Sequence, residues 1–339
     1  MKRPVSSLDL IANAALAGTA VLLVVRPQTL RVVGQSQLLP GGLKLASGVA
    51  RSLAKSFHEP RRAPSRERNR SAGRMLNGSA AVLALSVLAD SAVEHYRGSF
   101  ENRAMFTPLA MGTLSFAASA FGTADARAER HPVRDTIYAA AAVTGLAGFA
   151  FHAYNVLKRP GGLSWSNLFY AAPLGAPPAL ILSGLLGRGA ERVRATPFWR
   201  RPSVLGLPAG RALAALTAAG LAGTVGEAGL LHFRGAYHNP AMVMPVTVPP
   251  AAAVLLAASA IRPNRLTNRL ARWWLRLTAL LGFAGVGFHA YGVSRNMGGW
   301  RNWSQNVLNG PPLSAPPSFT GLALAGLAAL SLIEEDCDG

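Results

Sequence analysis

Long apolar stretches, separated by short polar loops, fill most of the chain. A transmembrane helix needs about 20 mostly apolar residues, and this pattern reaches that length repeatedly. The pattern predicts nine membrane spans, near residues 8–25, 75–94, 104–122, 135–156, 170–187, 212–231, 241–261, 273–292 and 316–333. Small residues recur within the spans, as at 144–148 and 282–287, and they let membrane helices approach closely. The predicted fold class is an all-α polytopic transmembrane protein.

Basic residues alternate from one set of loops to the other. One set holds 25 Lys and Arg residues, at 26–74, 123–134, 188–211 and 262–276. The other set holds seven, at 94–103, 155–169, 232–240 and 292–312. Cytoplasmic loops of membrane proteins carry the excess of Lys and Arg. The first set, and with it the C-terminus, is therefore predicted to be cytoplasmic.

The composition agrees with a membrane protein better than with a soluble one. Only 14% of the residues are charged, against about 25% in soluble proteins. The net charge of +19 would favour nucleic-acid binding, but no zinc-finger spacing or stacking-aromatic motif accompanies it. The expected partner is the lipid bilayer, with no nucleic acid. The richness in Arg, Ala and Gly is typical of bacterial genomes rich in G and C and favours a bacterial inner membrane.

Six segments follow from the spans and the loop charges. They are an N-terminal transmembrane helix (1–25), a basic cytoplasmic segment (26–74), a first four-helix repeat (75–187), a basic cytoplasmic linker (188–211), a second four-helix repeat (212–333) and an acidic cytoplasmic tail (334–339). A cleaved signal peptide is the alternative for the first segment, because two basic residues precede its apolar run. The single cysteine, Cys337, excludes a disulfide within the chain.

The second half of the chain repeats the first at an offset of 137 to 139 residues. The matching stretches are His95-Tyr96-Arg97-Gly98 with His232-Phe233-Arg234-Gly235, Phe151-His152-Ala153-Tyr154 with Phe288-His289-Ala290-Tyr291, and Pro173-Leu174-Gly175-Ala176-Pro177-Pro178 with Pro312-Leu313-Ser314-Ala315-Pro316-Pro317. Each copy holds an even number of spans, so both have the same orientation. The pattern predicts a parallel repeat whose axis lies along the membrane normal.

The repeated polar residues gather at the predicted periplasmic side. Four histidines, His95, His152, His232 and His289, fall near the outer ends of the first and third helix of each copy. These helices are diagonal neighbours in a four-helix bundle, so each copy can turn two histidines toward one another. The remaining candidates are Arg97, Arg234, Tyr154, Tyr291, Asp90 and Glu227. Ionisable groups within a membrane protein mark functional sites by default.

Two cofactors suit these residues. Paired imidazoles can bind haem b axially; Gly148 and Gly285 would leave room for its flat ring, and Arg97 and Arg234 would pair with its propionates. A quinone instead needs hydrogen-bonding groups and a path for protons. The four histidines would bind it, with Asp90, Glu227, Tyr154 and Tyr291 as secondary groups for hydrogen bonding or proton transfer.

Other functions stay open. Asp90 and His95 are five residues apart, as are Glu227 and His232, which separates their side chains by about 140° around a helix and disfavours a metal site. Phosphate-binding glycine loops, zinc-protease motifs and nucleophile elbows are absent from the sequence, so no self-contained enzyme is indicated. A secondary transporter, or a structural anchor whose histidines only cap helices, is the alternative.

Two four-helix bundles with one additional helix, and polar residues toward the periplasm, resemble the membrane subunits of the polysulfide-reductase type. The resemblance covers architecture only and includes no diagnostic motif. It implies a membrane subunit that exchanges electrons with quinone near the periplasmic face and anchors a periplasmic redox protein.

Overall fold

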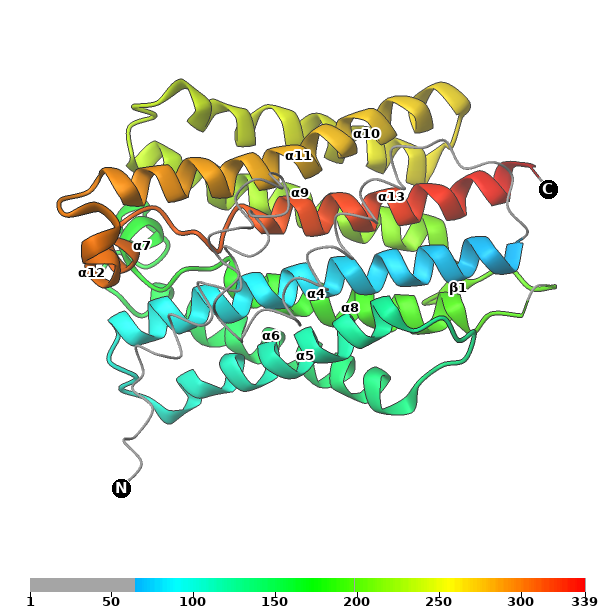
Figure 1. The fold of residues 1–339 in the computed structure, drawn as a ribbon, viewed down its shortest axis with the longest axis horizontal. Coiled ribbons are helices and arrows are strands. Elements are labelled where there is room, and N and C mark those ends of the chain that lie inside the picture. Colours follow the sequence, from blue (N-terminus) through cyan, green and yellow to red (C-terminus); the bar gives the residue numbers. More distant parts are fainter. Residues whose placement is uncertain (1–64, 198, 339) are drawn as a thin grey trace.

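The protein is described by a computed structural model, which covers residues 65–197 and 199–338. The predicted N-terminal helix at 1–25 and most of the basic segment at 26–74 lie outside these residues. Figure 1 shows the described helices running along one common axis, which is the arrangement expected of a membrane bundle.

Eight long helices make up the bundle in the described residues. They are α4 (Ser65–Arg97), α5 (Thr107–Ala124), α6 (Pro132–Leu157), α8 (Ala176–Arg194), α9 (Ala209–Arg234), α10 (Val248–Ile261), α11 (Arg265–Arg295) and α13 (Pro317–Asp338). Short elements connect them: the 3-10 helices η1 (Arg103–Phe106), η2 (Pro240–Val246) and η3 (Gly299–Asn302), the helices α7 (Trp165–Tyr170) and α12 (Trp303–Asn309), and a hairpin of β1 (Ser203–Val204) and β2 (Leu207–Pro208).

Seven helices of the described chain are long and apolar enough to cross a membrane. They correspond to seven of the predicted spans. The span predicted at 170–187 differs, because α7 ends at Tyr170 and the chain stays non-helical until α8 begins at Ala176. Prolines at 173 and 177 explain the late start, since proline disfavours helix in the residue before it. The second half of α8 also carries four charged residues, Arg188, Glu191, Arg192 and Arg194.

The helices pack in two groups of four. In one group, α4 and α6 each contact both α5 and α8; in the other, α9 and α11 each contact both α10 and α13. The two groups meet where α4 contacts α13 and α8 contacts α9. In Figure 1, α10 and α11 lie on one side of α4 and α13, and α5 and α6 on the other.

Burial separates central helices from peripheral ones. In the apolar windows of α4 and α13, 67% and 83% of the residues are buried, against 17% to 33% in the other five candidate spans. The exposed faces of those five carry large apolar side chains such as Phe121, Leu146 and Val254. Such faces suit contact with lipid, whereas α4 and α13 form the protein core.

Glycines bring α6 against α8 and α11 against α13. A Cβ at Gly145 would lie 2.7 Å from the backbone nitrogen of Ile181, and one at Gly282 would lie 2.8 Å from that of Thr320. Only glycine fits at these separations, as expected where small residues set the distance between membrane helices. This close packing fixes the position of each break before α8 and α13, and hence the loops that face the histidines.

Candidate functional site

All four predicted histidines lie near the same end of the bundle, which also carries α7 and α12 and is called the α7/α12 end below. His95 and His232 lie near the C-terminal ends of α4 and α9, and His152 and His289 near those of α6 and α11. The opposite end, with β1 and β2, is called the hairpin end (Figure 1).

Each histidine is hydrogen-bonded through Nδ1 to a backbone carbonyl oxygen. His95 bonds Met105 at 2.6 Å and His232 bonds Met242 at 2.9 Å. His152 bonds Pro173, and His289 bonds Pro312 at 2.6 Å. A carbonyl can only accept a hydrogen bond, so Nδ1 carries the proton in all four rings. A neutral ring therefore keeps an unprotonated Nε2, which can accept a proton or ligate a metal.

The histidines also lie near one another in pairs. His95 is close enough to His152 for their charges to interact, and the same holds for His289 and His232. Each pair joins the first and third helix of one helix group. The structure thus places two imidazoles with the same tautomer at the α7/α12 end of each group.

The turns after α4 and α9 have the same unusual backbone. Ser99 and Phe100 have φ values of 55° and 49°, and Ala236 and Tyr237 have values of 56° and 46°. Such left-handed conformations are uncommon for residues other than glycine. The aromatic side chain of each turn packs edge-on against the preceding histidine, with centroids 6.3 Å apart for Phe100 and 6.2 Å for Tyr237. Each turn therefore helps to fix an imidazole ring.

The two acidic candidates contact the opposite helix group rather than the histidines. Asp90, on α4, accepts a hydrogen bond of 3.1 Å from Ser314, which precedes α13. Glu227, on α9, is hydrogen-bonded to the backbone of Gly175, which precedes α8, and interacts electrostatically with Asp90. No described residue forms an ion pair with either carboxylate. The carboxylates thus occupy the boundary between the two groups.

The two arginine and two tyrosine candidates do not contact the histidines through any described hydrogen bond or ion pair. Arg97 pairs with Glu94 at 2.8 Å, and Arg234 donates to the carbonyl oxygen of Phe169 at 2.9 Å. Tyr154 and Tyr291 are 62% and 61% exposed. Two residues along a helix correspond to a rotation of about 200°, so these tyrosines face away from the neighbouring histidines. Their exposed positions fit an aromatic belt at the membrane surface.

The space beside Gly148 and Gly285 is filled. A Cβ at Gly148 would lie 3.5 Å from the ring of Pro177, and one at Gly285 would lie 2.8 Å from the ring of Pro316. A side chain at Gly285 would therefore overlap the proline, whereas one at Gly148 would make an ordinary van der Waals contact. Both glycines face the prolines at the starts of α8 and α13, a packing role that the sequence alone did not distinguish from a cofactor slot.

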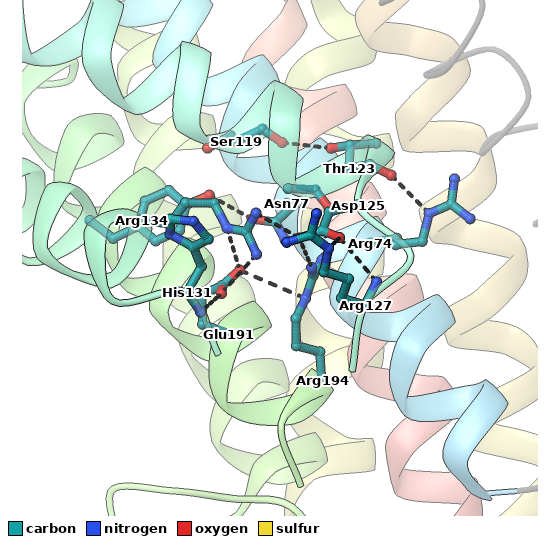
Figure 2. Close-up of polar contacts among 12 residues, drawn as sticks. Arg74, Asn77, Ser119, Thr123, Asp125, Arg127, His131, Arg134, Glu191 and Arg194 are labelled. Carbon is teal, nitrogen blue, oxygen red and sulfur yellow. Dashed lines mark hydrogen bonds and ion pairs between the residues drawn. The ribbon is translucent and has the colours of Figure 1, made fainter. Parts of the chain in front are cut away.

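A buried cluster of arginines and carboxylates occupies the hairpin end of the first helix group, and sequence analysis missed it. Figure 2 shows Arg134 between Asp125 and Glu191, with Arg194 beside them. Arg134 donates to Asp125 at 2.9 Å and to Glu191 at 3.0 Å. The Glu191 side chain is fully buried and also accepts from the backbone N–H of His131 at 2.8 Å. The exposed Arg127 also lies 3.9 Å from Asp125, so arginines surround both carboxylates.

These arginines entered the sequence analysis only as loop charges that report topology. The signal that could have revealed the cluster is Glu191, an acidic residue within the basic stretch 188–211. A carboxylate there needs cationic partners once it is buried. The cluster ties the loop after α5 and the start of α6 to the end of α8, which is a structural role.

No group of three or more His, Cys, Asp or Glu residues able to hold a metal occurs in the described part of the chain. No family model, characterised protein or solved structure matches this chain. The site is therefore interpreted from its own geometry. That geometry comprises two pairs of tautomer-fixed histidines at one end of a multi-pass helical bundle, with a carboxylate pair at the boundary between its halves.

Proposed function

We propose that the chain is an internal duplication of one four-helix unit, with two parallel repeats related by an axis along the membrane normal. The closed ring of contacts in each helix group supports this, as do the repeated histidine bonds. A side-chain pair at matched positions adds to it: Asn102 accepts from Ala104 N–H, and Asn239 from Ala241 N–H, both at 2.9 Å. An additional helix at residues 1–25 belongs to the same proposal.

The α7/α12 end is proposed to face the periplasm of a bacterium, across its inner membrane. The distribution of Lys and Arg supports this orientation, with 25 in the loops at one side and seven at the other. By the same rule the hairpin end and the C-terminus are cytoplasmic.

The proposed function is that of a membrane subunit in a periplasmic redox system, with a quinone-type ligand bound at the histidine pairs. The observation that carries this proposal is the Nδ1 bond of each of the four site histidines to a carbonyl oxygen. A neutral imidazole fixed in this way cannot donate from Nε2, but it can accept a proton. The site therefore favours the reduced ligand, quinol, whose hydroxyl groups can donate.

Oxidation of the quinol would release two protons and two electrons. Nε2 atoms of the histidines accept the protons as general bases. The two electrons pass to a periplasmic redox protein, for which this chain is the membrane anchor. Asp90 and Glu227 lie farther along the same helices and are proposed to relay protons between the units.

Haem b is the weaker alternative. The histidine tautomer would allow axial ligation, but proline rings lie beside the glycines that were expected to face a macrocycle. An absorption spectrum of the purified protein, oxidised and then reduced with dithionite, separates the two. Quinone binding predicts no sharp reduced Soret and α bands, together with quinone in an organic extract of the protein.

The decisive variants are His152→Asn and His289→Asn. The asparagine amide retains a donor near the Nδ1 position but provides no group at Nε2. We expect both variants to insert and fold like the wild type. Their affinity for quinone should fall at least tenfold, which is about 1.4 kcal/mol of binding free energy. Tyr154→Phe, on the exposed face of the same helix, is the matched control. Full quinone content in both asparagine variants would leave the histidines a purely structural role.

Secondary transport is a second candidate, favoured by the breaks before α8 and α13 beside the carboxylate pair. Interrupted helices at a repeat boundary are typical of substrate sites in transporters. Proteoliposomes without any redox partner distinguish the two functions. Proton movement that requires Asp90 and Glu227, but not the histidines, would support transport over the redox role.

A further inference from the structure

A pocket rich in arginine lies at the hairpin end, far from the histidines. Its volume is about 310 Å³, at the lower limit of about 300–1,000 Å³ that is usual for ligand sites. Four arginines contribute to its walls, together with two hydroxyl residues and nearby backbone. The lining side chains used below are Arg130, Arg192, Thr196, Arg200, Arg201 and Ser203.

The charge of the pocket is compensated only in part within the described chain. Arg130 pairs with Asp135. No described acidic residue forms an ion pair with Arg192 or Arg200. Guanidinium groups bind phosphate through paired hydrogen bonds, and the hydroxyl group of Ser203 adds a neutral donor, whereas that of Thr196 donates to the carbonyl oxygen of Arg192 at 2.8 Å. The lining therefore suits a phosphate group.

The hairpin beside the pocket presents apolar side chains to the outside. Val204 packs against the core of the bundle, whereas Leu205 at the tip is 84% exposed and Leu207 is 57% exposed. Trp199, in the loop between α8 and the hairpin, is 70% exposed. Exposed leucine and tryptophan beside basic residues are typical of segments that lie in the membrane interface.

The sequence Leu205-Gly206 is unfavourable for the backbone conformation of the hairpin turn. Leu205 and Gly206 have φ values of 54° and 78°, the pattern of a two-residue turn in which Asn-Gly is preferred. A leucine at the first position combines backbone strain with an exposed apolar side chain. The stability of the fold gives no reason for a leucine at this position. Contact of the Leu205 side chain with lipid acyl chains would give one.

We propose that this pocket binds the phosphate of an anionic phospholipid, while Leu205, Leu207 and Trp199 lie among the lipid acyl chains. The charge selects an anionic headgroup over a zwitterionic one. The apolar tip selects a lipid over a soluble phosphate. Only the leaflet, here the cytoplasmic one, depends on the orientation proposed above.

The test is a titration of the delipidated full-length protein in detergent with dioctanoyl-phosphatidylglycerol. Dioctanoyl-phosphatidylcholine and inorganic phosphate serve as comparison probes. We expect phosphatidylglycerol to bind most tightly. The double variant Arg192→Gln with Arg200→Gln should weaken that binding about 30-fold, because each arginine near an anionic lipid contributes roughly a fivefold factor in affinity.

Matched variants make the test specific. Arg262→Gln with Arg265→Gln removes two exposed arginines from the junction of α10 and α11 in the second helix group and should leave binding unchanged. Leu205→Asn should relieve the turn and raise thermal stability, yet weaken binding of phosphatidylglycerol. Equal affinity for both lipids, or an unaffected Arg192/Arg200 variant, would overturn the lipid site. Inorganic phosphate that binds as tightly as phosphatidylglycerol would assign the pocket to a soluble anion instead.

Discussion

At the scale of single residues, hydrogen-bond partners decide which chemistry a side chain can perform. The carbonyl oxygens of Met105 and Met242 accept hydrogen bonds from Nδ1 of two histidines, which leaves Nε2 of each neutral ring unprotonated. Sequence spacing could place these imidazoles near the end of the bundle. It could not give their tautomers, because the accepting carbonyls lie in the short helices η1 and η2, whose position against the histidines is set by the folded loop.

Asp125 provides a residue-scale prediction about pH. Partial burial alone would raise the pKa of Asp125, but hydrogen bonds from the Arg127 backbone N–H and from Arg134 outweigh it and hold the pKa below its ordinary value. The charged form therefore stabilises the fold at pH values above about 3.9. This contribution, of about 1–2 kcal/mol, is lost as the pH falls through the lowered pKa.

Thermal unfolding of the wild type and of Asp125→Asn in detergent checks this. At pH 7 the variant should unfold at a lower temperature, and the difference should shrink as the pH approaches 3. Glu129→Gln, an exposed change in the same loop, controls for the loss of one negative charge. A difference that is the same at pH 3 and pH 7 would contradict the assigned role of the carboxylate.

At the scale of helices, the breaks before α8 and α13 matter more than the spans themselves. Hydropathy identified the long apolar helices because their length and composition are unambiguous. It did not place the start of α8, where prolines interrupt the apolar run. Nor did it reveal that Gly175 and Ser314, at these breaks, contact acidic residues of the other helix group.

Gly175→Ala tests the contact between helix groups. A Cβ at this position would overlap the Glu227 carboxylate, and overpacking of this kind costs about 1–3 kcal/mol. We expect a lower unfolding temperature for Gly175→Ala. Because the clash involves one side chain, adding Glu227→Ala should restore most of the loss.

Gly226→Ala is the control for a new methyl group on α9. Nothing lies within 4 Å of a Cβ there, and alanine favours helix over glycine by about 1 kcal/mol, so this change should be neutral or stabilising. A Gly175→Ala variant as stable as Gly226→Ala would mean that the loop moves freely and does not hold the carboxylate.

At the scale of the whole molecule, apolar spans and loop charges predicted a multi-pass helical membrane protein. The seven candidate spans confirm that level of description. The buried cluster around Glu191 was beyond such reasoning, because loop counts treat every arginine alike. Its arginines pair with carboxylates, whereas Arg192 and Arg200 of the pocket at the hairpin end form no ion pair with a described acidic residue.

The orientation can be tested with the chain's single cysteine, Cys337. A membrane-impermeant maleimide should leave it unlabelled in intact spheroplasts and label it after lysis, because the C-terminus is predicted to be cytoplasmic. A second protein, with Cys337→Ser and Met297→Cys, serves as the converse. Met297 is 91% exposed at the α7/α12 end, so the new cysteine should react before lysis. The reverse result in both proteins would invert the topology.

The two contacts between the helix groups, Asp90 with Ser314 and Glu227 with Gly175, differ in the lengths of their side chains. On one side a short carboxylate, Asp90, meets a residue with a side chain, Ser314. On the other a longer carboxylate, Glu227, meets Gly175, which has none. In each contact, a shorter side chain on one residue is matched by a longer side chain on the other. We therefore expect the two residues of a contact to be substituted together. Under the duplication proposed above, a single four-helix unit would have made this contact only with a second copy of itself. Joining the two copies in one chain would let the two contacts differ in the lengths of their side chains.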